Sequence, residues 1–192
     1  PTQVLAISEK ASLGPFTGQL LVGEMNKPRI MRVMLEEVGG ELQGACIPFI
    51  DGSPLGRGCN RMDWAPDGSL FVGQTKHTWA GGQGIQRVSW NGKIPFEIRN
   101  MELSEKGFTF TFTQPVDKKS ALQKENWPFK RYFFEYRQAY GSPRSDEMEV
   151  EISKIEISGD GKIVEIFLSE LKPWHIHEVN IQNLKTQNGT PL

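Results

Sequence analysis

A stretch of sequence occurs twice in the first half of the chain, and this internal repeat restricts the fold more than any other feature. Residues 18–24 (GQLLVGE) return as residues 68–74 (GSLFVGQ), an offset of 50. Each copy is followed, in the same order, by Arg-Val at 32–33 and 87–88 and by Ile-Pro-Phe at 47–49 and 94–96. The order is kept while the spacing drifts, as expected when strands are fixed and loops vary. Repeats of about 40–50 residues that contain several short strands predict β-propeller blades.

Turn chemistry within the repeat supports this prediction. Pro66-Asp67-Gly68 stands between two apolar segments, where Pro fixes φ and Gly supplies a positive φ, so it predicts a tight hairpin between two strands. Gly23 and Gly73 stand at the ends of the repeated strand, where the missing side chain permits close packing of neighbouring blades. Residues 1–94 are therefore predicted to form two blades of an incomplete propeller.

From residue 95 onward the pattern changes to that of a β-sandwich. Phe and Thr alternate over 107–113, which is typical of a half-buried antiparallel strand. Further strands are predicted at 131–136, 151–157, 162–168 and 174–184, with a hairpin turn at 158–161 and a short helical stretch at 118–124. This spacing predicts an immunoglobulin or fibronectin-like sandwich over 95–192. The fold class expected for the chain is all-β, with two propeller-type blades followed by that sandwich.

Charge and hydropathy exclude two classes of partner. The chain has 22 basic and 23 acidic side chains and a formal net charge of −1, whereas a nucleic-acid-binding domain carries a clear basic surplus. Its apolar runs are only a few residues long, far short of the ~20 that a transmembrane helix needs. We therefore expect no nucleic-acid partner and no transmembrane segment.

The motifs of the first half resemble the closing part of a six-bladed propeller of the quinoprotein glucose/sorbosone dehydrogenase-like family. In that family a strand that begins near an Asn leads into Pro-Asp-Gly and a Leu-Phe-Val-Gly strand, as at 60–73 here. Segments 18–24, 29–33, 44–49 and 84–88 are more narrowly similar to the large secreted "membrane-bound dehydrogenase" proteins, which often continue into a cytochrome c module. The second half resembles bacterial Ig-like domains that carry Phe-Thr-x-Pro-Val-Asp, here 112–117, and close with Asn-Gly-x-Pro-Leu, here 188–192.

This resemblance implies a longer parent protein. The repeat accounts for two blades, whereas a propeller ring needs at least about four, so we expect a C-terminal piece in which Pro1 marks a missing beginning. The parent could hold pyrroloquinoline quinone (PQQ). This chain is expected to hold no cofactor, because the catalytic His and Arg would come from earlier blades and a Cys-x-x-Cys-His haem motif is absent. The implied partners are the remaining blades or another chain, and a cytochrome or membrane complex, in the periplasm or outside the cell.

The resemblance also makes Asn60 and Arg61 candidate cofactor-binding residues. Segment 57–63 would form the innermost strand of a blade and line the central channel, where relatives present Asn and Arg to the quinone and the sugar. An Arg can bind a carboxylate through two hydrogen bonds, and an Asn can bind hydroxyl groups. The alternative is that Arg61 pairs with Asp63 or with a carboxylate of a neighbouring blade.

Two loops offer candidate binding residues. The glycine-rich loop 76–84 carries His77 and Trp79, which could contact a sugar or a partner, although Trp79 could instead cap the blade core. Loop 140–146, with Tyr140 and Arg144, is the best candidate for an exposed site on the sandwich. Most of the aromatic side chains between Tyr132 and Tyr140 are expected to lie in the core or in cross-strand pairs.

The histidines and cysteines each leave two interpretations open. His175 and His177 would share one face of a strand and could hold a metal ion through two imidazoles. Because Val179 continues that face with a core-type residue, a packed structural pair is the alternative. Cys46 and Cys59 could form a disulfide in an oxidising compartment, or they could be two buried free thiols.

The function expected from these features is structural or binding rather than catalytic. The sequence offers no Ser-His-Asp triad, no pair of catalytic carboxylates and no Cys-His nucleophile at a useful spacing. The chain would hold a partner, a glycan or the rest of a dehydrogenase-like propeller. The alternatives are a fragment of an active PQQ-dependent sugar or alcohol dehydrogenase that passes electrons to a cytochrome, and a subunit of a periplasmic electron-transfer assembly.

Overall fold

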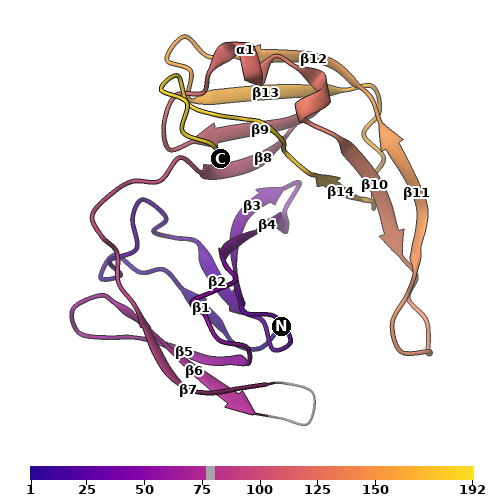
Figure 1. The fold of residues 1–192 in the computed structure, drawn as a ribbon. Helices are drawn as coiled ribbons and strands as arrows, with labels where there is room; N and C mark the ends of the chain where they lie inside the picture. Colours follow the sequence, from indigo (N-terminus) through magenta and orange to yellow (C-terminus); the bar gives the residue numbers. More distant parts are fainter. Residues whose placement is uncertain (77–80) are drawn as a thin grey trace. The chain divides into compact units, whose positions relative to one another are not determined.

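The computed structural model describes residues 1–76 and 81–192, and within them the chain is built from antiparallel sheets (Figure 1). It divides into two compact units, Pro1–Ile94 and Pro95–Leu192. Helix in the described residues is confined to α1 (Lys118–Ala121) and the 3-10 turn η1 (Lys124–Asn126). None of the sheets formed by these residues closes on itself. The prediction of an all-β chain is confirmed.

The N-terminal unit contains two sheets that follow the chain order as simple meanders. The first has the order β1-β2-β3-β4 and the second the order β5-β6-β7. Their strands are β1 (Val4–Ala6), β2 (Leu20–Gly23), β3 (Arg29–Val38), β4 (Glu41–Asp51), β5 (Cys59–Trp64), β6 (Leu70–Lys76) and β7 (Gly81–Val88).

The sequence repeat is also a repeat of strand pairing. Leu20 on β2 pairs with Val33 on β3, and Leu70 on β6 pairs with Val88 on β7 in the same way. The next positions agree as well, since Leu21 faces Arg32 where Phe71 faces Arg87. The third match diverges. Ile47-Pro48-Phe49 lies in β4, whereas 94–96 lies outside the strands, at the boundary between the two units.

The two sheets of the N-terminal unit pack against each other through opposite faces of the repeated strand. The first sheet contributes Leu21 to the shared core, whereas the second contributes Leu70 and Val72, which correspond in sequence to Leu20 and Val22. Leu21, Leu70 and Val72 are completely buried, while Phe71, the counterpart of Leu21, is 39% exposed on the far side of its sheet. Equivalent faces of the two repeats therefore point in the same direction.

At Gly23 the two sheets approach each other closely. A Cβ built on it would lie 2.5 Å from the carbonyl oxygen of Cys59 in the second sheet. A Cβ on the equivalent Gly73 meets only Arg61 of its own sheet, at 3.6 Å. Gly23 therefore permits the close packing that was predicted, whereas Gly73 lies on the outer face of its sheet, where no other sheet formed by the described residues of this unit approaches it closely.

The predicted tight turns are confirmed in both units. Pro66-Asp67-Gly68 joins β5 to β6, with Gly68 at a φ of 80° and the Asp67 carboxylate accepting hydrogen bonds from both the backbone N–H (3.0 Å) and the hydroxyl (2.7 Å) of Ser69. In the C-terminal unit the turn at 158–161 joins the two predicted strands, and Gly161 has a φ of 72°. Both turns use a left-handed glycine, as the sequence required.

The C-terminal unit also contains two antiparallel sheets, in the orders β12-β13-β9-β8 and β11-β10-β14. Rings from the two sheets meet in the core, where Phe129 lies 5.8 Å from Phe108 and 6.5 Å from Phe110, an arrangement compatible with a β-sandwich. The strands are β8 (Ile98–Ser104), β9 (Gly107–Phe112), β10 (Phe129–Phe134), β11 (Arg144–Val150), β12 (Ile152–Ile157), β13 (Ile163–Leu168) and β14 (Ile176–Val179).

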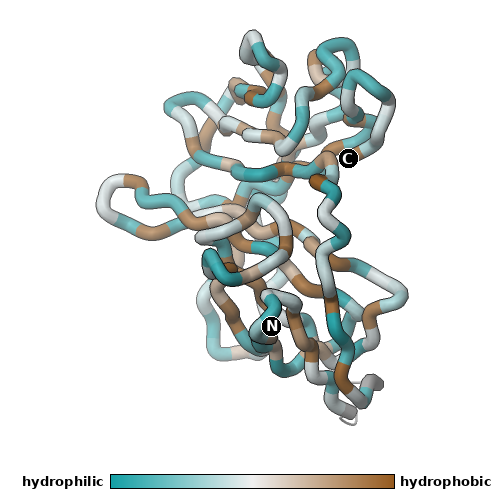
Figure 2. The backbone as a smooth tube through the Cα atoms, turned by 90° about the vertical axis from the view of Figure 1, so that its left-hand side faces the viewer, coloured by the Kyte–Doolittle hydropathy of each residue, from teal (hydrophilic) through white to brown (hydrophobic). Residues whose placement is uncertain are grey.

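Three details of this unit differ from the sequence predictions. Strand β10 ends at Phe134 instead of residue 136, β14 covers only Ile176–Val179 of the predicted 174–184, and β11 occupies residues that were assigned partly to a loop. Backbone conformation explains the shortening of β14, because Trp174 and Asn183 both have a positive φ that an extended strand does not allow. Apolar and polar residues alternate along the backbone tube of both units (Figure 2).

Candidate functional site

The strands β10 and β11 form a ribbon that extends beyond the third strand of their sheet. Pairing with β14 ends at Tyr132 and Ile176, whereas the ribbon continues to the pair Phe134 and Arg144 (Figure 1). The connection 135–143 follows that last pair. The tip of this ribbon therefore extends beyond the part of β10 that pairs with β14.

Two tyrosines on this connection are completely exposed. Tyr136 and Tyr140 have relative exposures of 107% and 106%. The connection is nevertheless braced, because the backbone N–H of Glu135 donates to the Ser142 hydroxyl at 2.9 Å and Arg137 donates to the carbonyl of Gly141 at 2.9 Å. Most aromatic side chains of this region were expected in the core or in cross-strand pairs, and Tyr136 is an exception because β10 ends two residues before it.

Arg144 is the first residue of β11, directly after the connection, and its side chain lies on the outer face of the sheet. Its guanidinium carbon is 4.0 Å from the centroid of the Tyr132 ring, and its Nη2 is 2.6 Å from a carboxylate oxygen of Glu178. The hydroxyl of Tyr132 donates to the same oxygen at 3.1 Å, and burial together with this hydrogen bond raises the pKa of the phenol. Arg144 is 39% exposed and keeps part of its surface available to a ligand.

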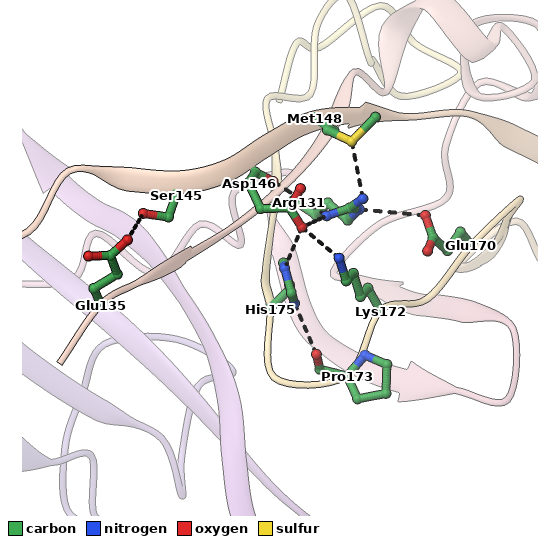
Figure 3. Close-up of polar contacts among 9 residues, drawn as sticks. All are labelled: Arg131, Glu135, Ser145, Asp146, Met148, Glu170, Lys172, Pro173 and His175. Atoms are coloured by element: carbon green, nitrogen blue, oxygen red, sulfur yellow. Dashed lines mark hydrogen bonds and ion pairs between the residues drawn. The ribbon is translucent and has the colours of Figure 1, made fainter.

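The opposite face of the ribbon holds a second polar cluster, centred on Asp146 (Figure 3). One oxygen of its carboxylate accepts hydrogen bonds from Arg131, from Lys172 at 2.7 Å and from His175 at 3.0 Å. These bonds, that from Lys172 first, lower the pKa of Asp146 well below its ordinary value. The Arg131 side chain is only 6% exposed and also reaches Glu170 at 3.5 Å.

His175 links this cluster to the segment before β14. Its Nδ1 is 2.9 Å from the carbonyl oxygen of Pro173, and its Nε2 is 3.0 Å from Asp146. Both partner atoms are oxygens, so the ring bridges the Pro173 carbonyl and the Asp146 carboxylate. Trp174, between the two bonded residues, is 96% exposed.

His177 occupies a different environment from His175. Its ring lies 5.5 Å from that of Phe108 in the core, and its Nε2 is buried without a hydrogen-bond partner. Burial lowers the pKa of this imidazole. The described residues contain no group of three or more His, Cys, Asp or Glu side chains that could hold a metal ion. A metal ion bound by the two histidines stays a prediction, and each ring already has protein contacts.

The candidate cofactor residues of the N-terminal unit lie on β5. Arg61 donates to the backbone carbonyl of Asn60 at 3.0 Å and to its side-chain oxygen at 3.2 Å. Arg61 also lines a shallow depression of about 390 Å³ on the outer face of its sheet, together with Asp63, Phe71 and Ile85. The role of Asn60 and Arg61 in cofactor binding stays a prediction.

Two further predictions concern the remaining candidates. His77 and Trp79 lie outside the described residues. Cys46 and Cys59 are free cysteines, so the disulfide is not formed, and only Cys59 is buried because Cys46 is exposed on β4.

Sequence reasoning did not single out Asp146, Arg131 or Trp174 as a group. These residues come together because the pairing of β10 with β11 shifts register between Arg131 and Phe133, which places Asp146 at the irregularity with a φ of 53°. A bulge of this kind has no reliable sequence signal. Tyr136 could have been found, since Gly141 and Pro143 follow it closely and both favour a turn.

No family model, no curated protein and no solved structure matches this chain. The resemblance to propeller and Ig-like families therefore rests on the sequence motifs alone. The described residues contain no helix with the length and apolar character that a membrane crossing requires.

Proposed function

We propose that this chain is a non-catalytic, binding part of a secreted or periplasmic propeller protein of the quinoprotein dehydrogenase-like kind. The N-terminal unit supplies two neighbouring blades. The C-terminal unit is an Ig-like sandwich whose β10–β11 ribbon docks a partner protein.

The observation that carries the blade assignment is the direction in which the two repeats face. In a closed two-sheet sandwich of like repeats, equivalent faces would meet each other. Here the face of Leu21 meets the face that carries Leu70 and Val72, which is a head-to-tail contact between two copies of the same unit. Head-to-tail stacking leaves a complementary face open at each end, and it is the arrangement from which a ring of blades is built.

The two open faces have the chemistry that such stacking requires. Leu20 and Val22 remain only half-buried on the outer face of the first sheet, although their counterparts Leu70 and Val72 are completely buried. On the outer face of the second sheet Phe71 is 39% and Ile85 74% exposed. A solvated face of an antiparallel sheet is normally polar, so apolar residues on both outer faces support contact with further repeats.

The stacking proposal predicts self-association of a particular kind. At high concentration the outer face of β5–β7 in one copy should cover the outer face of β1–β4 in another. Phe71→Asp should destroy one face and Val22→Asp the other, so that each variant alone sediments as a monomer. A mixture of the two variants retains one intact face of each type and should form a one-to-one dimer, measured by analytical ultracentrifugation. A wild-type monomer at every concentration, or no dimer in the mixture, would contradict the proposal.

A protein is the partner that the ribbon fits best. Tyr and Arg dominate the energetics of protein interfaces, and Tyr136, Tyr140 and Arg144 all lie on the ribbon with exposed surface. Small ligands need a concave site that surrounds them, whereas Tyr136 and Tyr140 are completely exposed. The braced backbone of 135–143 keeps the ordering cost of binding low.

Affinity capture with matched variants tests the docking role. The immobilised full chain, the double variant Tyr136→Ser/Tyr140→Ser and the control Leu42→Ser are compared, because Leu42 is a 75% exposed residue of the other unit. We expect the same protein, identified by mass spectrometry, to bind the wild type and the control and to be lost from the double variant. Equal capture by all three chains would refute docking at the ribbon. Binding to a glycan array that disappears in the double variant would assign the surface to a carbohydrate instead.

A further inference from the structure

Trp174 combines two properties that rarely occur together. Its side chain is 96% exposed, and its backbone has a φ of 63°, in the left-handed region that L-residues seldom adopt. Strained backbone of this kind persists only where the surrounding contacts hold it, and it is concentrated at functional sites. The contacts around Trp174 therefore show which residues hold this conformation.

The residues on both sides of Trp174 are bound to the same carboxylate. Lys172 Nζ is 2.7 Å and His175 Nε2 is 3.0 Å from the Oδ2 atom of Asp146. The Nδ1 of His175 is also 2.9 Å from the carbonyl oxygen of Pro173, and this contact spans Trp174 (Figure 3). Three of the four residues in 172–175 are thus fixed by hydrogen bonds, and the fourth carries the exposed indole.

Asp146 is itself held rigidly. Its φ is 53°, and its carboxylate is bonded to Arg131, whose side chain is almost completely buried and also contacts the Met148 sulfur at 3.2 Å. Two left-handed residues on different segments, Asp146 and Trp174, are therefore joined through one hydrogen-bonded cluster.

This cluster lies at the base of the β10–β11 ribbon. The ring of His175 is 5.3 Å from that of Phe133, which is the penultimate residue of β10. Tyr136 follows Phe133 by three residues, a span of about 10 Å in extended chain. The segment that carries Trp174 therefore lies against the strand that leads to Tyr136.

We propose that Trp174 is a third aromatic anchor of the partner-binding ribbon. Asp146 is the positioning residue that fixes the conformation of Trp174 before a partner binds. Asp146 contacts no partner in this proposal. It fixes 172–175 so that the indole is already ordered before binding, and this pre-organisation lowers the entropy cost of forming the interface. The inference rests on the docking role proposed above, and it names a residue and a device that the docking role does not require.

NMR relaxation of the free full chain tests the device without any partner. In the wild type, the backbone amide and the indole N–H of Trp174 should show order parameters near the rigid value of about 0.85. In Asp146→Asn, which tolerates a left-handed φ but cannot bind the same three donors equally, both should fall below about 0.6. Lys172→Met removes one of the three donors and should give a smaller decrease.

Glu147→Gln is the matched control, because Glu147 is the next residue on β11 and pairs with Lys130 and Arg144 instead of with 172–175. It should leave Trp174 rigid. The amides of Phe110 and Phe129 report whether each variant keeps its core. A rigid Trp174 in Asp146→Asn with the core intact, or a mobile Trp174 in the wild type, would overturn the proposal. Because no partner is present, either result is independent of whether the ribbon docks a protein.

Discussion

The two units bury apolar sheet faces in different ways. In the N-terminal unit the two copies of one repeat pack through opposite faces, and the outer face of each sheet carries apolar residues such as Val22 and Phe71, with Arg61 and Asp63 beside Phe71. In the C-terminal unit Phe108 and Phe110 meet Phe129 between the sheets, and the outer face of β10 carries the ion-paired cluster of Arg144 and Glu178. We propose that further copies extend the first arrangement, whereas ion-paired side chains occupy the outer face of the second.

Matched substitutions at Leu21 and Phe71 should give the largest difference between the two faces of the repeat. Leu21→Ala removes a completely buried side chain and should lower the free energy of unfolding by about 3 kcal/mol. Phe71→Ala, at the equivalent position, should cost about 1 kcal/mol or less because the ring is already 39% exposed. Urea unfolding measures both values. An equal decrease in the free energy of unfolding for both variants would mean that the two faces are equally buried and would contradict the difference described here.

Alanine at the two repeat glycines should also affect stability unequally, with the larger loss at Gly23. Gly23→Ala forces a methyl group against the Cys59 carbonyl and should cost about 2 kcal/mol, whereas Gly73→Ala should change stability by less than about 0.5 kcal/mol. Thermal unfolding of the two variants beside the wild type is sufficient. A tolerated alanine at 23 would show that the sheets can separate at this point.

The two units also differ in backbone strain. Among the described residues, the non-glycine positions with a positive φ are Asp146, Trp174 and Asn183, all in the C-terminal unit. Trp174→Gly should therefore raise the free energy of unfolding by about 1 kcal/mol relative to Trp174→Ala, which keeps the Cβ. Chemical denaturation of this pair measures the difference. No gain from glycine would mean that Trp174 is not strained.

The smallest expected effect is a pH dependence confined to the C-terminal unit. Burial lowers the pKa of His177, so the folded state binds fewer protons than the unfolded state. Stability should then decrease as the pH falls below the ordinary histidine value of about 6.5. In His177→Gln the free energy of unfolding should depend less on pH in this range. Urea unfolding at several values between pH 8 and 5 measures this dependence. A profile that is unchanged in the variant would exclude His177 as the source.

The sequence predicted features that depend on local chemistry. The repeat at 18–24 and 68–74 has the same strand register in both copies, and the turns at 66–68 and 158–161 form where Gly permits them. Segment 94–96 matches 47–49 in sequence but forms no strand, because the chain leaves the sheet there and continues into the next unit.

The candidate site was only partly predictable. Tyr140 and Arg144 were both assigned to a loop from its composition; Tyr140 lies in the connection 135–143, whereas Arg144 is the first residue of β11. Asp146 could not be recognised, since its role arises from a register shift in β10–β11 and from donors 15, 26 and 29 residues away in sequence. Trp174 was placed in a strand because aromatic residues favour strands, and the tertiary contacts of its neighbours overrode that local preference.

The two cysteines give the chain a chemically unequal pair of thiols. Cys46 is exposed on β4, whereas Cys59 is buried in the core between the two repeats. Partial burial raises the pKa of the Cys46 thiol, so alkylation at neutral pH should be slow but selective for this one position. A fluorophore attached there labels the N-terminal unit without any substitution. Its fluorescence can then report the unfolding of this unit or its association with another copy.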